Sequence, residues 1–254
     1  MNSFRALLTL LAVLAAFSAL GPVAHAQPVG SAGFSEASAV AAIVKVPRPW
    51  YAPRLLVASK MRDTIDEYGS LPGLSFKAYS FARADGHYGG IYLWKDLASA
   101  RGWFSPAWFS RVERERGAPG QVRLFEVLAV LDNTSGGTGF DKDSPAVSTL
   151  VEVPVADGQS RQQVAARLLQ SASADQAIAG LMRRYFIVSD HGTFGTISLW
   201  KDEASARSAL DGAWSERMLR ESGRAPQVEW FDTPILLPSR VPGNRLPDGM
   251  MMRR

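Results

Sequence analysis

The sequence predicts an α+β fold made of two tandem βαββαβ domains, and three observations lead to this prediction. The 27 residues that start at Ile91 return at Ile197, 106 positions later, with 15 identities and no gap. A repeat of about 100 residues has the size of a small domain, which is too large for a solenoid unit. Strand and helix patterns also follow one another in the same order around both segments.

Each copy opens with a strand closed by proline, continues with a helical pattern and two strands joined by a turn, and ends with a helical region and a last strand. The predicted elements in the two copies are strands at 42–47 and 148–154, helices at 54–67 and 160–174, strands at 74–82 and 181–189, strands at 89–94 and 195–200, and strands at 121–131 and 227–237.

The helical region before the last strand should divide into two helices in each copy. Asp96 and Asp202 can cap the first helix with their carboxylates. A Ser-Pro pair at 105–106 and an Asp-Gly pair at 211–212 then interrupt the pattern, and both are suited to start a new helix.

This order is the split ferredoxin-like arrangement, a four-stranded antiparallel sheet with helices on one face. The other face needs a cover, and the second copy can provide it. We therefore expect a monomer in which the two sheets form an intramolecular dimeric α+β barrel. Alternation along the third strand separates Ile91 and Leu93 from Tyr92 and Trp94. We assign the aliphatic pair to the helix side and the aromatic pair to the barrel interior.

The domains are expected at residues 40–131 and 148–237, with a glycine-rich linker at 132–147 and a flexible tail at 238–254. Residues 1–26 have the pattern of a signal peptide: Arg5, an apolar run over 6–20, and a small-x-small site that ends at Ala26. Cleavage would export the mature chain to the periplasm or the medium.

Composition excludes several classes of function. The chain has no cysteine, so thiolate metal sites, disulfides and a cysteine nucleophile are ruled out. The net charge of +4 comes from interleaved acidic and basic residues, which argues against nucleic-acid binding. His87 and His191 do not align between the copies, so we predict no haem ligand and no metal site.

The motif from Gly89 to Ala100, GGIYLWKDLASA, and its second version from Gly195 to Ala206, GTISLWKDEASA, resemble the signature of the YdhR-like monooxygenase family. That family belongs to the superfamily of dimeric α+β barrels that includes the antibiotic-biosynthesis monooxygenases. The resemblance implies sheet-to-sheet packing of the copies with a pocket in each half. It also implies oxidation of an aromatic substrate by molecular oxygen without a cofactor, as in some relatives.

The strongest candidate site combines aromatic and cationic residues that the copies share. Aligned across the repeat, Lys77 matches Arg183 and Tyr79 matches Tyr185, so each copy keeps a cation two residues before a tyrosine. Such a set could bind a small aromatic acid or a phenolate. Core packing of the aromatic residues and an ion pair at the barrel rim are the alternative. With the strand-end tryptophans, the candidate ligand-binding residues are Lys77, Tyr79, Trp94, Arg183, Tyr185 and Trp200.

Two functions remain open at this point. One is an exported monooxygenase-like enzyme that acts on a small aromatic or quinonoid compound without a cofactor, with no catalytic residue assigned. The other is a non-catalytic periplasmic protein of the same fold, associated with small-molecule binding or with stress. A pocket-facing ionisable residue in both copies would favour the enzyme.

Overall fold

The computed structural model describes residues 33–134, 146–156 and 158–253. The predicted signal peptide and most of the predicted linker lie outside these residues. Within the described ranges, no helix is long and apolar enough to cross a membrane.

The first half of the chain contains four long strands and four helices. In order they are β1 (Val40–Val46), α1 (Arg54–Asp63), α2 (Ile65–Gly69), β2 (Leu74–Ala82), β3 (Tyr88–Trp94), α3 (Leu97–Trp103), α4 (Pro106–Arg116) and β4 (Gln121–Asp132).

The second half repeats this order with one helix in place of the first two. Its elements are β5 (Ala146–Pro154), α5 (Arg161–Asp175), β6 (Leu181–Val188), β7 (Thr193–Trp200), α6 (Glu203–Ala209), α7 (Gly212–Ser222) and β8 (Gln227–Pro238). The chain ends with η1 (Pro242–Asn244), η2 (Asp248–Met250) and β9 (Met251–Arg253).

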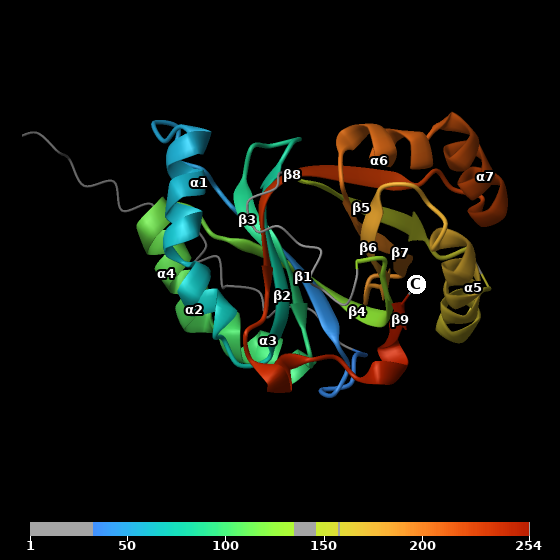
Figure 1. Ribbon diagram of the computed structural model, residues 1–254, viewed down its shortest axis with the longest axis horizontal. Helices are drawn as coiled ribbons and strands as arrows, with labels where there is room; N and C mark the ends of the chain where they lie inside the picture. The colour runs from blue at the N-terminus through green and yellow to red at the C-terminus, as the bar shows by residue number, and fades with distance from the viewer. Residues whose placement is uncertain (1–32, 135–145, 157, 254) are drawn as a thin grey trace, which may run out of the picture.

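The eight long strands close into one antiparallel barrel. The strand order is β1-β3-β2-β8-β5-β7-β6-β4, and β4 pairs again with β1 to complete the ring. The two halves join where β2 pairs with β8 and where β4 pairs with β6. The helices of the first half cover one side of this barrel and those of the second half cover the other (Figure 1). Closure leaves no exposed edge between the halves.

The two faces of the sheet carry different side chains. Ile91 and Leu93 belong to the cluster inside the barrel, together with residues from both halves. Tyr92 and Trp94 belong to the cluster under the first-half helices, and Trp200 has the same place in the second half. The sequence-based assignment of these faces was therefore wrong. An eight-strand barrel is just wide enough for side chains to fill it, and rings such as Phe76 and Tyr185 share its interior with aliphatic residues, so ring size does not indicate the face.

The predicted helix breaks are present. Asp96 caps α3 and accepts a hydrogen bond from the Ser99 amide at 2.7 Å, and Asp202 caps α6 in the same way. Ser105 caps α4, which begins at Pro106. The helix predicted over 54–67 differs, because it divides at Thr64 into α1 and α2.

The C-terminal segment is not the tail that the sequence predicted. Asn244 is buried, and its side chain bonds the Gly73 amide and the Leu71 and Leu74 carbonyls. Leu246 joins the barrel cluster, and β9 pairs in parallel with β4. The physical reason is that Asn244 finds its hydrogen-bond partners, and Leu246 its apolar contacts, only against the barrel.

Candidate functional site

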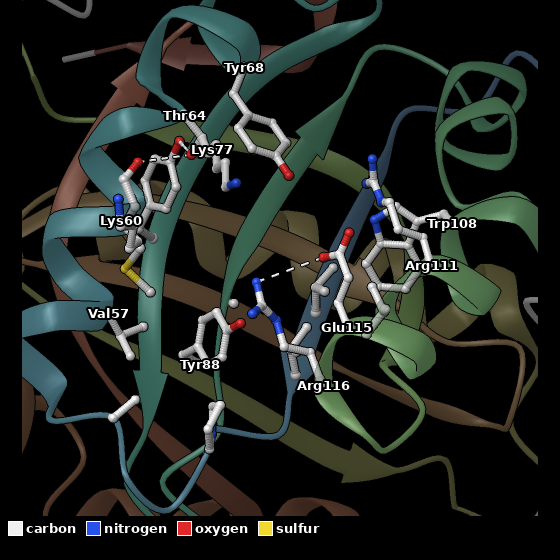
Figure 2. Close-up of a pocket in the computed structure, with 18 of the residues that line it drawn as sticks. Val57, Lys60, Thr64, Tyr68, Lys77, Tyr88, Trp108, Arg111, Glu115 and Arg116 are labelled. Carbon is white, nitrogen blue, oxygen red and sulfur yellow. Dashed lines mark hydrogen bonds and ion pairs between the residues drawn. The ribbon is translucent and has the colours of Figure 1, made fainter.

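A cavity of about 460 Å³ lies between the first-half sheet and helices α1, α2 and α4. It is outside the barrel proper, on the helix-covered face of the sheet. Val57 and Met61 of α1 line one wall, and Trp108 and Val112 of α4 line another. Figure 2 shows side chains of α1, α2 and α4 converging on the space above β2 and β3. Its volume falls in the range of small-molecule sites.

Lys77 forms the floor of this cavity. It stands on β2, is only 3% exposed, and points its amine into the space beside Tyr68 (Figure 2). The Nζ atom lies 3.0 Å from the ring centroid of Tyr68, 4.0 Å from that of Tyr79 and 4.6 Å from that of Tyr92. No carboxylate of the described residues lies within ion-pair distance of this amine. Three aromatic faces therefore take the place of a counter-ion.

Burial changes the acid–base properties of this cage. It lowers the pKa of Lys77 well below the ordinary lysine value, because the ammonium form loses its hydration; Glu67 opposes this shift at longer range. Burial also raises the pKa of Tyr92, and that of Tyr79 despite the opposing bond to Thr64. Near neutral pH both tyrosines keep their hydroxyl protons, and burial shifts Lys77 toward its neutral form.

Local contacts hold the cage in place. The Tyr79 hydroxyl and the Thr64 hydroxyl are 2.9 Å apart, and Thr64 in turn donates to the Met61 carbonyl at 2.8 Å. The break between α1 and α2 thus positions Thr64 over β2. Gly90 lies beside the amine, where an added Cβ would be 3.3 Å from Lys77 Cε and 2.9 Å from the Ala78 carbonyl oxygen. A side chain at this position would crowd the lysine.

The mouth of the cavity carries charged groups and exposed apolar groups. Lys60, Arg111 and Arg116 line it, and Glu115 is 3.9 Å from the Arg116 guanidinium. Tyr51 also lines the mouth and is 70% exposed. A ligand with an aromatic body and an anionic or polar end would find contacts for both parts.

The matching region of the second half is closed by an ion pair. Strand pairing places Lys77 opposite Tyr92 and Arg184 opposite Ser198, so Arg184 is the counterpart of Lys77. Arg184 bonds Ser198 Oγ at 2.9 Å, pairs with Asp175 of α5 at 2.8 Å and stacks 5.5 Å from the Trp200 ring.

The structure therefore divides the six predicted site residues. Lys77 and Tyr79 line the cavity, and Trp94 lies behind Tyr92, stacked at 6.2 Å. Trp200 packs under the second-half helices. Tyr185 lies inside the barrel, as does Arg183, which pairs with Asp132 at 2.7 Å and stacks on Phe76. These six residues do not form two equivalent sites.

The sites differ because the two copies are not aligned by one constant offset: β2 and β6 are shifted by one residue relative to the sequence-based alignment. The turn between β2 and β3 is closed by a bond from the Ala82 amide to the His87 carbonyl, whereas the Ser189 amide bonds Thr193 in the second half. The β6–β7 turn is one residue shorter than the β2–β3 turn. Matching residues are therefore 107 positions apart between β2 and β6, and 106 positions apart between β3 and β7. The pairing of Lys77 with Arg183 and of Tyr79 with Tyr185 was wrong, because a slip of one residue reverses the face of a strand.

Sequence reasoning missed Tyr68, Thr64 and the α4 residues of the cavity. Part of the cavity could have been found from the sequence, because strand alternation puts Tyr92 on the same face as Trp94, which was among the candidate site residues. Tyr68 could not be assigned, since its position depends on how α2 is set against the sheet. Both histidines lie at the β2–β3 and β6–β7 turns, beside Asp85 and Asp190. Among the described residues, no group of acidic and histidine side chains could hold a metal ion.

The fold of this chain is similar to that of several solved structures, including the following three. A candidate monooxygenase from Fusobacterium nucleatum superposes with a TM-score of 0.57 at 11% identity, over 80% of this chain and 96% of its own. An anthrone oxidase-like protein gives 0.55 at 9% identity, over 83% and 96%. A candidate monooxygenase from Lactobacillus acidophilus gives 0.54 at 10% identity, over 79% and 96%.

No family model matches the chain, and no curated protein matches it in sequence. At these identities the solved structures show the fold alone. The chain therefore has the α+β barrel fold of monooxygenase-like proteins.

Proposed function

We propose that the first-half cavity binds a small planar aromatic compound, phenolic or quinonoid, and that molecular oxygen oxidises this compound there without a cofactor. The observation that carries the proposal is Lys77, a buried amine without a carboxylate partner among the described residues, at the floor of an aromatic cavity. Burial shifts this amine toward its neutral form, which is a base, and the ring faces can hold the ammonium that a proton transfer would create.

The chemistry begins with removal of a proton. The neutral amine of Lys77 accepts a proton from an acidic O–H or C–H bond of the bound compound and becomes an ammonium. The ring faces of Tyr68, Tyr79 and Tyr92 stabilise this ammonium, by about 2 kcal/mol for a desolvated contact. The hydroxyl groups of Tyr79 and Tyr92 stay protonated, so they add no negative charge beside the anion that forms.

Oxygen then completes the reaction. For a methylene flanked by aromatic rings, as in anthrone, CH₂ and O₂ give C=O and H₂O. One oxygen atom enters the product and the other leaves as water, and the substrate supplies all four electrons. No external reductant is needed for this balance. The likeness to an anthrone oxidase-like protein supports a substrate of this class.

We further propose that residues 40–131 and 148–237 are tandem ferredoxin-like copies of a YdhR-like domain, and that the mature protein is an exported monomer. The shared order of elements and the repeated motif support the duplication. The pattern in residues 1–26 supports export.

Non-catalytic binding is the second candidate function. Arg111 at the cavity mouth favours it, because a cation there suits retention of an anionic aromatic compound; Lys60 and Arg116 also line the mouth and are paired with Asp63 and Glu115. Oxygen uptake distinguishes the two functions.

The test measures oxygen consumption with anthrone and with simple phenols, and measures binding in parallel by quenching of tryptophan fluorescence. We expect Lys77→Met to lower oxygen uptake by about 100-fold or more, as loss of a general base does. Lys95→Met, on the surface beside Asp96, is the matched control and should change nothing. Saturable binding without oxygen uptake would support the binding protein. Absence of binding to the wild-type chain would refute both functions.

A further inference from the structure

Lys77 differs from the other lysines of the chain. The sequence has six lysines, which makes each of them identifiable by peptide mapping. Lys45 is paired with Asp85 and Glu229, and Lys60 with Asp63. Lys95 lies 4.0 Å from Asp96, and Lys201 is exposed. Lys77 alone among the described lysines is enclosed by aromatic rings at the floor of a cavity.

We propose that Lys77 captures an aromatic aldehyde or ketone covalently, as an imine, inside this cavity. The inference rests on the proposed function in one respect, namely that the cavity admits aromatic ligands. It adds a reaction that oxygen chemistry does not require and names the carbonyl compound as the class that the site retains.

The geometry meets the needs of this reaction. An amine attacks a carbonyl carbon only in its neutral form, and a buried amine without a counter-ion is shifted toward that form. Tyr68, Tyr79 and Tyr92 surround the amine with ring faces, which can stack on the aromatic part of the compound and keep water from the C=N bond. Gly90 lets Lys77 Cε pack closely against β3, where an added Cβ would be 3.3 Å from it.

The step is balanced without a further reactant. The nitrogen attacks the carbonyl carbon, its two protons leave with the carbonyl oxygen as water, and a C=N bond replaces the C=O bond. Nothing is oxidised or reduced. The cavity has to accept the compound and release one water molecule.

The second half provides an internal contrast. Counting back from the aligned strands, Asp175 occupies the position of Tyr68, and it pairs with Arg184 in the position of Lys77. A guanidinium stays protonated in proteins and forms no imine under these conditions. The same framework thus holds a reactive amine on one side and a fixed ion pair on the other.

The test uses the full-length chain at neutral pH with 4-hydroxybenzaldehyde and cyanoborohydride, which reduces the imine and fixes it. Intact-mass measurement and peptide mapping follow. Among the lysines we expect one fast adduct, on Lys77, formed on the order of tenfold faster than on any other lysine, because its enclosed amine is shifted toward the neutral form; the α-amino group is mapped separately. Lys77→Arg should remove the adduct, and the matched control Lys95→Arg should keep it. Labelling spread over the surface lysines with no preference for Lys77 would overturn the proposal.

A second variant covers the case in which Lys77→Arg does not fold. Tyr68→Asp gives Lys77 the carboxylate that Arg184 has, which should hold the amine protonated and suppress the adduct by about tenfold or more. An unchanged adduct in folded Tyr68→Asp would also overturn the proposal. Oxygen uptake separates this proposal from the proposed function: adduct formation without oxygen uptake refutes the oxygenase only, and oxygen uptake without an adduct refutes the imine only.

Discussion

The two halves of the barrel place a cation at the same strand position and give it different partners. In the first half Lys77 lies against the ring of Tyr68, and in the second half Arg184 pairs with Asp175 and stacks on Trp200. The aromatic partner leaves an amine at the floor of an open cavity. The carboxylate partner joins helix α5 to strand β6.

The difference shows how one framework can serve two purposes. A buried cation is costly unless it is paired, so removal of the carboxylate would destabilise the second half. The first half keeps a buried amine that no described carboxylate pairs with, as expected of a group retained for its reactivity. Variants that remove or exchange these partners show how much each one contributes to the stability and acid–base behaviour of its half.

The largest effect is expected from removing the carboxylate of the second half. Asp175→Asn leaves Arg184 mostly buried without its counter-ion, and we expect the free energy of unfolding to fall by about 3 kcal/mol. Urea denaturation followed by circular dichroism measures it. Asp63→Asn, which breaks an exposed pair with Lys60, is the control and should cost less than about 1 kcal/mol. Equal costs for the two variants would show that the pair at Asp175 is not structural.

The next effect is the pH dependence that Lys77 adds to stability. Its pKa is lowered in the folded chain, so between that value and the ordinary 10.5 the unfolded chain binds more protons. Stability contributed by this residue therefore rises with pH in that window, with a slope of at most about 1.4 kcal/mol per pH unit.

The measurement compares wild type with Lys77→Met by urea denaturation from neutral pH to pH 10. We expect the stability of wild type relative to the variant to increase with pH. Tyrosines with raised pKa values titrate above this range and are common to both chains. A difference that stays flat would mean that Lys77 keeps its ordinary pKa.

A smaller effect concerns the tryptophans under the helices. Trp200 donates to Thr149 Oγ1 at 2.9 Å, whereas the indole nitrogen of Trp94 is buried without a hydrogen-bond partner among the described residues. Strand pairing places Ala42 in the position of Thr149. We expect Thr149→Val to lower the free energy of unfolding by about 1 kcal/mol. Ala42→Val at the matching site removes no hydrogen bond and tests the effect of bulk; a loss seen only there would contradict the account.

The smallest effect is expected for Lys77→Met at neutral pH. Methionine fills the same space without a charge to desolvate, so stability should be unchanged or rise by about 1 kcal/mol. Thermal unfolding, read together with oxygen uptake, measures it. A loss of more than about 2 kcal/mol would assign Lys77 a structural role.

Much of the architecture could be predicted, because it depends on local signals. The repeat at Ile91 and Ile197 gave the order of the elements, and Asp96 and Asp202 marked the helix starts through a property of single residues. The sheet faces could not be assigned, because alternation separates two sets of residues without indicating which set lies inside.

The candidate site depends on two longer-range facts. One is the shorter turn after Ser189, which shifts the second half by one residue and separates Lys77 from its apparent partner Arg183. The other is the break at Thr64, which brings Tyr68 over the sheet. Neither can be read from composition or periodicity.

NMR of the lysine side chains measures whether the aromatic cage holds an amine with a lowered pKa. Protein labelled with ¹³C-lysine is titrated with pH, and the six Cε signals are assigned by single Lys→Arg variants. We predict that Lys77 titrates well below the ordinary lysine value of 10.5 and returns toward it in Tyr68→Asp. Six signals that titrate together near 10.5 would contradict the account.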